Sequence, residues 1–120
     1  MKKLLTIFCL VLLSSYSYSE DLPPDKLVER QGITYKINST TPFTGSVFNV
    51  YSNGQLRFRT YYKDGLRHGL RVRYYRNGQL REKGNYKNGK PVGRHEWFEE
   101  DGTPFCWKNG KVVDMFYCED

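Results

Sequence analysis

Short runs of alternating apolar and polar residues follow one another along the chain from Leu27 onward, separated by glycine-containing turns. Runs of this length with that alternation predict β-strands. The expected strands are Leu27–Arg30, Ile33–Ile37, Phe43–Tyr51, Gln55–Tyr62, Leu70–Tyr75, Gln79–Tyr86, Arg94–Phe98, Pro104–Lys108 and Lys111–Tyr117. Asn38 to Pro42 form a polar link between strands, and no segment after the first residues has the apolar spacing of a helix. The pattern therefore predicts an all-β protein.

Turn pairs of Asn-Gly or Asp-Gly predict how these strands are joined. At Asn53-Gly54, Asn77-Gly78 and Asp101-Gly102 we expect two-residue type I′ turns, because Asn or Asp tolerates positive φ and Gly prefers it. The turns at Asp64-Gly65 and Asn88-Gly89 are expected to be longer and to end at Gly69 and Gly93. The chain is thus expected to form consecutive antiparallel hairpins.

This turn assignment fixes an expected strand register. The predicted pairs are Tyr51 with Leu56, Asn49 with Phe58, Phe48 with Arg59, Tyr75 with Leu80, Tyr74 with Arg81, Arg73 with Glu82, and Val72 with Lys83. Neither face of these hairpins is wholly apolar, whereas a sandwich has one apolar and one polar face. The expected architecture is therefore an extended, twisted single-layer sheet, in which aromatic rings and basic stems cover one another.

A 24-residue repeat underlies the strand pattern. The sequence Tyr-x-Asn-Gly-Gln-Leu occurs at Tyr51–Leu56 and again at Tyr75–Leu80, and glycines at positions 45, 69 and 93 keep the same step. A fixed period of this length indicates tandem copies of one unit that stack on their neighbours. The third copy, with an early turn at Asn109-Gly110, is expected to act as a cap.

The first 19 residues have the pattern of a secretory signal peptide. Lys2 and Lys3 precede the apolar run Leu4–Leu13, and small residues stand before Glu20. The run is shorter than the roughly 20 residues that span a bilayer, although a retained membrane anchor is the alternative. We expect cleavage, export to the periplasm or outside a bacterial cell, an N-terminal hairpin and link over residues 20–41, and repeats over 42–120.

Two cysteines, Cys106 and Cys118, would remain after cleavage, and an oxidising compartment favours a disulfide between them. The pairing requires the tail to fold back, because a two-residue turn at Asn109-Gly110 would place Cys106 opposite Val113. A free or intermolecular pair is the alternative.

Basic residues are concentrated in the middle of the chain. Residues 57–94 contain twelve Arg or Lys and two acidic residues, whereas residues 95–120 contain two Lys and seven acidic residues. Such segregation attracts oppositely charged partners, although the same stems could simply cover a thin sheet. Anionic lipid or envelope glycan is another possible partner, and nucleic acid is not expected. The candidate partner-binding residues are Arg57, Arg59, Tyr62, Arg71, Arg73, Tyr75, Arg76 and Arg81.

No catalytic, metal or cofactor site is expected. His68 and His95 do not have the spacing of zinc-binding motifs, and His68 stands beside Gly69 in an expected turn. The acidic residues around Glu99 belong to a hairpin end, which offers no cleft that could separate the pKa values of two carboxyl groups. The chain is therefore expected not to be an enzyme.

These motifs resemble the MORN-repeat family, in the bacterial variant whose members are often labelled YwqK-family antitoxins. The similar segments are Pro42–Gly45, Tyr51–Leu56, Tyr61–Gly69, Tyr74–Leu80, Asn85–Gly93 and Glu96–Gly102. The resemblance implies a sheet of consecutive hairpins that binds proteins or lipids. It suggests a secreted immunity protein that neutralises an acidic toxin. The alternative is a cell-envelope scaffold that binds anionic lipid, glycan or an assembly partner.

Overall fold

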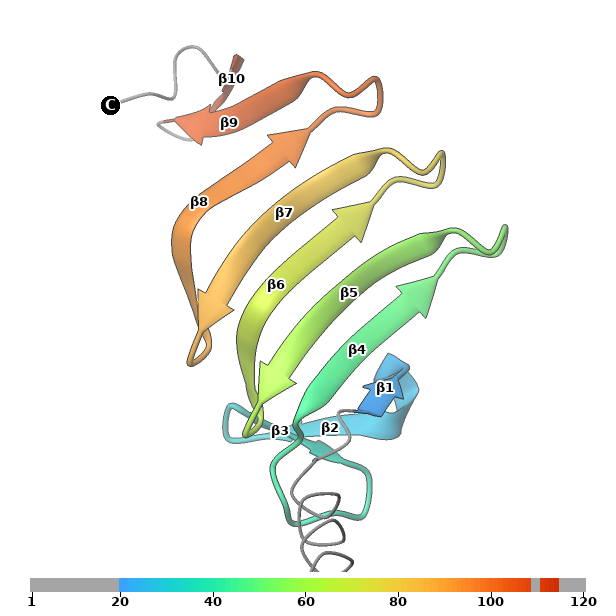
Figure 1. Ribbon diagram of the computed structural model, residues 1–120, viewed down its shortest axis with the longest axis vertical. Helices are drawn as coiled ribbons and strands as arrows, with labels where there is room; N and C mark the ends of the chain where they lie inside the picture. Colours follow the sequence, from blue (N-terminus) through green and yellow to red (C-terminus); the bar gives the residue numbers. More distant parts are fainter. Residues whose placement is uncertain (1–19, 109–110, 115–120) are drawn as a thin grey trace, which may run out of the picture.

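The computed structural model describes residues 20–108 and 111–114 and shows an open sheet of consecutive hairpins. The elements are β1 (Glu20–Leu22), a 3-10 turn η1 (Pro24–Lys26), β2 (Leu27–Arg30), β3 (Ile33–Lys36), β4 (Gly45–Val50), β5 (Leu56–Lys63), β6 (Leu66–Tyr74), β7 (Leu80–Lys87), β8 (Lys90–Phe98), β9 (Pro104–Lys108) and β10 (Lys111–Asp114). The main sheet has the order β1-β4-β5-β6-β7-β8-β9-β10, and β2 and β3 form a separate hairpin (Figure 1). The expected all-β hairpin array is confirmed.

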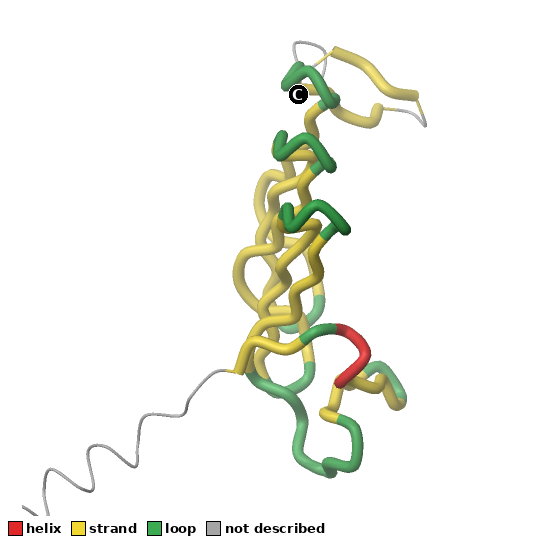
Figure 2. Tube along the Cα trace, turned by 90° about the vertical axis from the view of Figure 1, so that its right-hand side faces the viewer, coloured by secondary structure: helices red, strands yellow, loops and turns green. Residues whose placement is uncertain are grey.

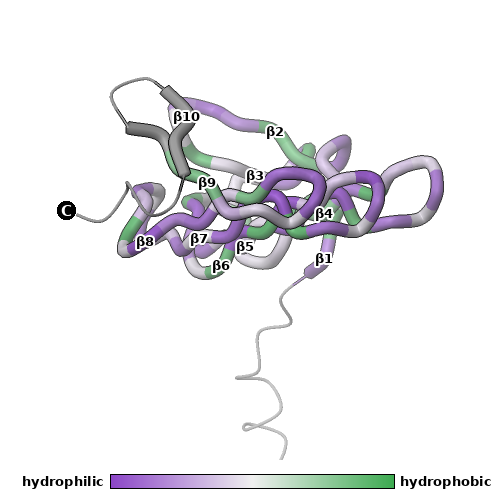
Figure 3. The backbone as a smooth tube through the Cα atoms, turned by 90° about the horizontal axis from the view of Figure 1, so that it is seen from above, coloured by the Kyte–Doolittle hydropathy of each residue, from purple (hydrophilic) through white to green (hydrophobic). Residues whose placement is uncertain are grey.

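The main sheet is a single layer. Figure 2 shows strands β4–β8 edge-on with no second sheet packed on them, and Figure 3 shows hydrophilic and hydrophobic segments mixed along the strands. Among the described residues, only Phe43 (4% exposed) and Val47 (7%) are buried apolar side chains. The expectation of an extended sheet without a conventional core is therefore correct.

The two-residue hairpin turns lie at the opposite end of the repeat from where the sequence predicted them. Asp64-Gly65 has φ values of 51° and 80°, and Asn88-Gly89 has 51° and 84°. Positive φ at both central positions is the signature of the type I′ turn. These turns join Lys63 to Leu66 and Lys87 to Lys90 as direct partners, so β6 and β8 begin earlier than expected. Gly69 and Gly93 lie inside these strands rather than in the turns.

The Tyr-x-Asn-Gly loops have a different conformation because only their glycines have positive φ, 85° at Gly54 and 90° at Gly78. The loop of residues 52–54 closes through hydrogen bonds from Tyr51 N to Gln55 O (2.8 Å) and from Gly54 N to Tyr51 O (2.9 Å). Asn53 instead accepts the Gln55 N–H on its Oδ1 at 3.0 Å. This is a three-residue hairpin loop, so the type I′ prediction at this end was wrong.

A bulge after each three-residue loop restores the predicted pairing. Asn49 pairs with Phe58, Phe48 with Arg59, Arg73 with Glu82 and Val72 with Lys83, as expected. Beside the loops, Val50 pairs with Leu56 and Tyr74 with Leu80, so the expected pairs Tyr51–Leu56, Tyr75–Leu80 and Tyr74–Arg81 are wrong. Arg57 and Arg81 are the extra residues that the two bulges absorb.

The N-terminal unit of β1, η1, β2 and β3 closes one edge of the array. Strand β1, which the sequence pattern did not predict because Glu-Asp-Leu has no strand signature, runs parallel to β4. The Ser46 hydroxyl bonds the Asp21 carboxylate, and Lys36 forms an ion pair with Glu20 at 2.8 Å. The β2–β3 hairpin is joined to the first repeat by a bond from Thr34 N to Gly65 O at 2.9 Å.

Several expectations concern residues outside the described ranges. These are the signal peptide at 1–19, the turn at Asn109-Gly110, the end of the last strand at 115–117, and Cys118. Within the described ranges, no helix is both long and apolar enough to cross a membrane.

We predict that Gly65→Ala lowers the free energy of unfolding more than Gly54→Ala does. Both residues have positive φ, which costs an L-residue about 1–2 kcal/mol. A Cβ at Gly65 would in addition overlap Ile33 Cγ2 and lie 3.0 Å from Thr34 O, whereas nothing lies within 4 Å at Gly54. We expect about 1–3 kcal/mol of extra loss at Gly65 in urea unfolding. Equal losses would contradict the close approach of β3 to this turn.

Candidate functional site

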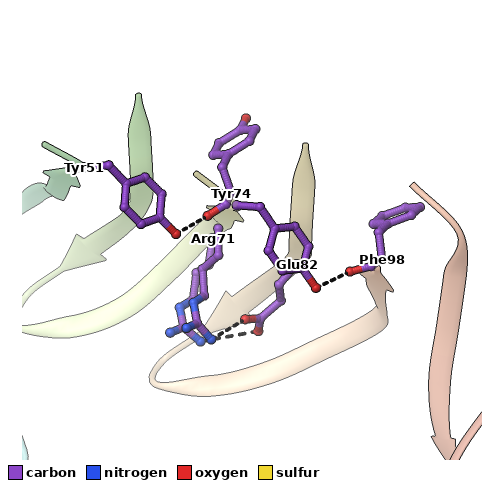
Figure 4. A network of polar contacts seen from close by, with 7 residues as sticks. Tyr51, Arg71, Tyr74, Glu82 and Phe98 are labelled. Carbon is purple, nitrogen blue, oxygen red and sulfur yellow. Dashed lines mark hydrogen bonds and ion pairs between the residues drawn. The ribbon is translucent and has the colours of Figure 1, made fainter. Parts of the chain in front are cut away.

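The repeated Tyr and Asn side chains connect each hairpin loop to the next one. Tyr51 Oη donates to Tyr74 O at 2.7 Å, and Tyr75 Oη donates to Phe98 O at 2.8 Å (Figure 4). Asn53 Nδ2 donates to Arg76 O at 3.0 Å in the same way. Because every bond reaches 23 residues ahead, these contacts join successive repeats. We call them the inter-repeat bonds.

The third loop carries Asp101 where the first two carry Asn. The second loop still donates to it, through Asn77 Nδ2 to Glu100 O at 3.1 Å. Asp101 accepts the Thr103 N–H at 2.9 Å, and hydrogen bonds from the Thr103 side chain and backbone hold the pKa of this exposed carboxyl below its ordinary value. Because the pKa is lowered, the hydrogen bonds from Thr103 to the Asp101 carboxylate stabilise the fold at neutral pH. That stabilisation is lost as the pH falls through the folded-state pKa of Asp101. A carboxylate cannot donate to a further repeat.

Strand register divides the side chains between two faces, because directly paired residues point to the same side of a sheet. One row contains Val47, Thr60, Arg71 and Gly84, and the adjacent row contains Asn49, Phe58, Arg73, Glu82 and Trp97. We call this side the arginine face. The opposite side, which we call the rear face, carries the row Phe48, Arg59, Val72, Lys83 and Glu96.

Glu82 is the buried acidic residue of the arginine face, with 6% of its surface exposed. Its two carboxylate oxygens accept from Arg71 Nη1 at 3.4 Å and from Arg73 Nη1 at 3.3 Å (Figure 4). One carboxylate therefore holds two guanidinium groups side by side. Arg71 Nε is buried without a hydrogen-bond partner, so its donor capacity is not exhausted by this contact.

A hollow of about 360 Å³ opens beside this cluster on the arginine face. Its lining consists of Pro24, Val47, Arg57, Phe58, Thr60, Tyr62, Arg67, Arg71 and Arg73. Neither Arg57 nor Arg67 forms an ion pair with any described residue. Four arginines line the hollow. Glu82 pairs two of them, and Glu29 lines a neighbouring pocket with Tyr62 and Arg67 without forming an ion pair with a described residue, so positive charge is in surplus.

Arg67 is held between two tyrosines. Its guanidinium lies 5.5 Å from the centre of the Tyr86 ring, and Tyr62 is its direct partner on β5. Burial lowers the pKa of Arg67, but a hydrogen bond with Tyr62 and the interactions with both tyrosine hydroxyls outweigh burial and leave it raised. The Arg67 side chain is therefore permanently charged and lies against the Tyr86 ring.

The structure brings four of the eight candidate partner-binding residues to the hollow, namely Arg57, Tyr62, Arg71 and Arg73. The others lie elsewhere. Arg59 belongs to the rear face, where it covers Phe48 at 5.8 Å. Arg76 bonds Ser52 Oγ at 3.1 Å, Arg81 lies 5.4 Å from the Tyr75 ring, and Tyr75 makes an inter-repeat bond. None of the eight assignments to a partner is tested by these positions.

The sequence pattern does not point to Arg67, because it predicts a turn that ends at Gly69 before a strand starting at Leu70. The type I′ signal at Asp64-Gly65 would have placed Arg67 in a strand directly opposite Tyr62. Beside the hollow, His95 packs over Gly84 and contacts Tyr86 (5.5 Å) and Trp97 (5.6 Å), which extends the aromatic part of the same face.

The described residues include no candidate metal cluster, and they do not test the predicted disulfide. Residues 20–108 and 111–114 contain no group of three or more His, Cys, Asp or Glu that could hold a metal ion. Cys106 lies half-buried in β9, but Cys118 is outside the described ranges, so their pairing stays a prediction.

Comparison with known families identifies two repeats. Residues 43–64 and 67–88 match the family model described as MORN repeat variant. Each match covers one hairpin, β4–β5 or β6–β7, together with its three-residue loop. No curated protein and no solved structure matches the chain. The repeat identity is therefore shown for residues 43–88. Beyond the matched segments, Phe98 at the end of β8 accepts the inter-repeat bond from Tyr75.

Loss of one inter-repeat bond should be measurable. We predict that Tyr75→Phe lowers the free energy of unfolding by about 0.5–1.5 kcal/mol, because the Phe98 carbonyl loses its donor and the ring stays. Tyr61→Phe is the matched control, since Tyr61 is 41% exposed and its hydroxyl makes no hydrogen bond to the described residues. Urea denaturation followed by tryptophan fluorescence measures both. The same midpoint for the two variants would show that the bond is not stabilising.

We further predict that Glu82→Gln is destabilising by about 1–3 kcal/mol, since it leaves Arg71 and Arg73 without their shared carboxylate. The partial exposure of both arginines keeps this below the loss from a fully buried pair. Glu100→Gln removes the same charge from an exposed loop and should stay within about 0.5 kcal/mol of the wild type. A Glu82→Gln variant as stable as Glu100→Gln would contradict a structural role for the ion pairs.

Proposed function

We propose that this chain is a non-enzymatic repeat module of the bacterial cell envelope that binds a protein partner through its arginine face. The observation that carries the proposal is the hollow, in which Arg57 and Arg67 have no acidic partner among the described residues. MORN repeats are generally protein- or lipid-binding modules, and the matched repeats contain most of the hollow.

A pre-ordered surface supports this proposal. The inter-repeat bonds at Tyr51 and Tyr75 fix successive hairpins relative to each other. The sheet therefore loses little conformational entropy when a partner binds. Arginine and tyrosine, which surround the hollow, are residue types enriched among those that dominate binding energy at protein interfaces. The net charge of the segment 57–94, with twelve basic and two acidic residues, would accelerate encounter with an acidic partner.

We propose a non-enzymatic function because the side chains of the hollow are suited to binding an anion and not to proton transfer. Thr60 supplies a hydroxyl, but the arginines around it are permanently protonated and cannot accept its proton. The nearby carboxylate, Glu82, has both oxygens engaged by Arg71 and Arg73. Such a set can fix an anion in place, and a general base in reach of a nucleophile is missing from it.

Neutralisation of an acidic toxin is the specific form of this function that we propose. The signal-peptide pattern at residues 1–19 supports the proposal that such an immunity role is carried out in the periplasm or outside the cell. An envelope scaffold that binds anionic lipid or glycan is the competing function, favoured by the same positive charge.

The proposal predicts one stoichiometric protein partner in the native envelope. The tagged protein is used as bait on solubilised envelope fractions, with an unrelated basic protein of equal net charge as the control. We expect a partner that binds the purified protein at a 1:1 ratio by calorimetry, and that is toxic when it is produced alone. Recovery of lipid or wall material without a protein partner would overturn the proposal in favour of the envelope scaffold. A non-toxic 1:1 partner would remove the immunity role and keep protein binding.

A further inference from the structure

We infer that the hollow on the arginine face is a receptor for an acidic side chain carried by an extended segment of a protein partner, with Arg57 and Arg67 as its direct ligands. The inference rests on the proposed function and names the chemistry that the site recognises. It also separates these two arginines from Arg71 and Arg73, which line the same hollow but are already paired.

The charge balance of the hollow identifies the ligand as an anion. Glu82 lies on the same face and uses one oxygen for each of Arg71 and Arg73. Arg57 and Arg67 line the same hollow and form no ion pair with a described residue, although Glu29 lines an adjoining pocket with Arg67. The Arg67 guanidinium in addition lies 5.5 Å from the centre of the Tyr86 ring, which reduces the conformational freedom that it loses when it binds an anion. A carboxylate is matched by this planar donor geometry.

The shape of the arginine face favours a peptide over a membrane surface. Pro24 of η1 lines the hollow, so the N-terminal unit stands on this side of the sheet (Figures 2 and 3). A planar bilayer would meet this projecting unit before its headgroups could reach Thr60 and Arg71 on the floor. An extended chain segment is narrow enough to enter beside the unit.

The mixed lining of the hollow also suits an amino-acid side chain. Val47, Phe58 and Pro24 offer apolar surface next to the guanidinium groups. The methylene groups of a Glu side chain and an apolar neighbour can pack there while the carboxylate reaches Arg67. A volume of about 360 Å³ is at the lower end of ligand pockets, which provides room for a few side chains and not for a folded element.

Binding of a defined peptide tests the inference. The probe is a fluorescein-labelled heptapeptide of six Glu around a central Phe, compared with the same peptide carrying Gln, in fluorescence anisotropy with the purified protein. We expect the Glu peptide alone to bind, and Arg67→Gln or Arg57→Gln to weaken it about tenfold, the loss typical of a charge-assisted hydrogen bond. Lys83→Gln is the matched control, because it removes one exposed charge from the rear face, and its affinity should stay within about twofold.

Three results would overturn the inference. One is equal weakening by Lys83→Gln, which indicates attraction by net charge alone. Another is full affinity in both Arg67→Gln and Arg57→Gln. The third is binding to phosphatidylglycerol vesicles without binding to the Glu peptide. Circular dichroism checks whether each variant is folded. Arg57 lies on an exposed bulge, so Arg57→Gln is expected to fold and tests the inference even where Arg67→Gln disturbs folding.

The envelope partner separates failure of this inference from failure of the proposed function. A 1:1 partner that binds the Arg57→Gln/Arg67→Gln variant as tightly as the wild type would keep the proposed function and overturn the hollow as its receptor. Peptide binding that depends on both arginines, without any envelope protein partner, would support the acidic-ligand site and overturn the proposed function.

Discussion

Bonds between neighbouring repeats hold this fold together, because a single-layer sheet cannot bury a conventional core. Only two apolar side chains are buried among the described residues. The backbone ladder joins adjacent strands, and the hydroxyl groups of Tyr51 and Tyr75 add a contact that skips from one hairpin to the next. Stability is then a sum of neighbour terms of modest size, as in other repeat proteins. Both faces of the sheet consequently remain open to solvent or to a partner.

An open face imposes its own constraint, since charged residues cannot be hidden in a core and must be paired or solvated. Glu82 meets this constraint for Arg71 and Arg73, and it does so at low exposure, where an unpaired carboxylate would be unfavourable. Arg57 and Arg67 meet it only through solvent and the tyrosine rings beside them. The uncompensated positive charge of the arginine face is therefore located at Arg57 and Arg67, a localisation that the total charge of the face does not describe.

Much of the fold follows from the sequence, because the 24-residue period, the strand pattern and the absence of an apolar face all constrain the same architecture. The turns were assigned to the wrong ends because Asn-Gly has two solutions. Asn88 adopts positive φ in a two-residue turn, whereas Asn77 bonds the Gln79 N–H with its side chain and leaves positive φ to Gly78. The loop at Asp101-Gly102 has the same conformation as the one at Asn77, with Asp101 accepting the Thr103 N–H, so the choice between the two solutions cannot be read from the residue pair alone. The missed Arg67 is a consequence of that error, since its place in β6 depends on the turn before it.

Successive repeats have the same residues at the loop positions that make inter-repeat bonds, and they have different residues on the arginine face. The loop residues Tyr51 and Asn53 recur 24 positions later as Tyr75 and Asn77, and all four make inter-repeat bonds. One repeat further along, the positions of Phe58, Thr60, Arg71 and Arg73 are occupied by Glu82, Gly84, His95 and Trp97. Identical units would present the same groups at every step and could not define one site. The change from Phe58 to Glu82 supplies the carboxylate that pairs Arg71 and Arg73. The change from Arg71 to His95 ends the run of arginines in that row. Departures from the repeat therefore give the hollow on the arginine face a lining that the periodic positions do not share, and the proposed specificity for a partner would originate there.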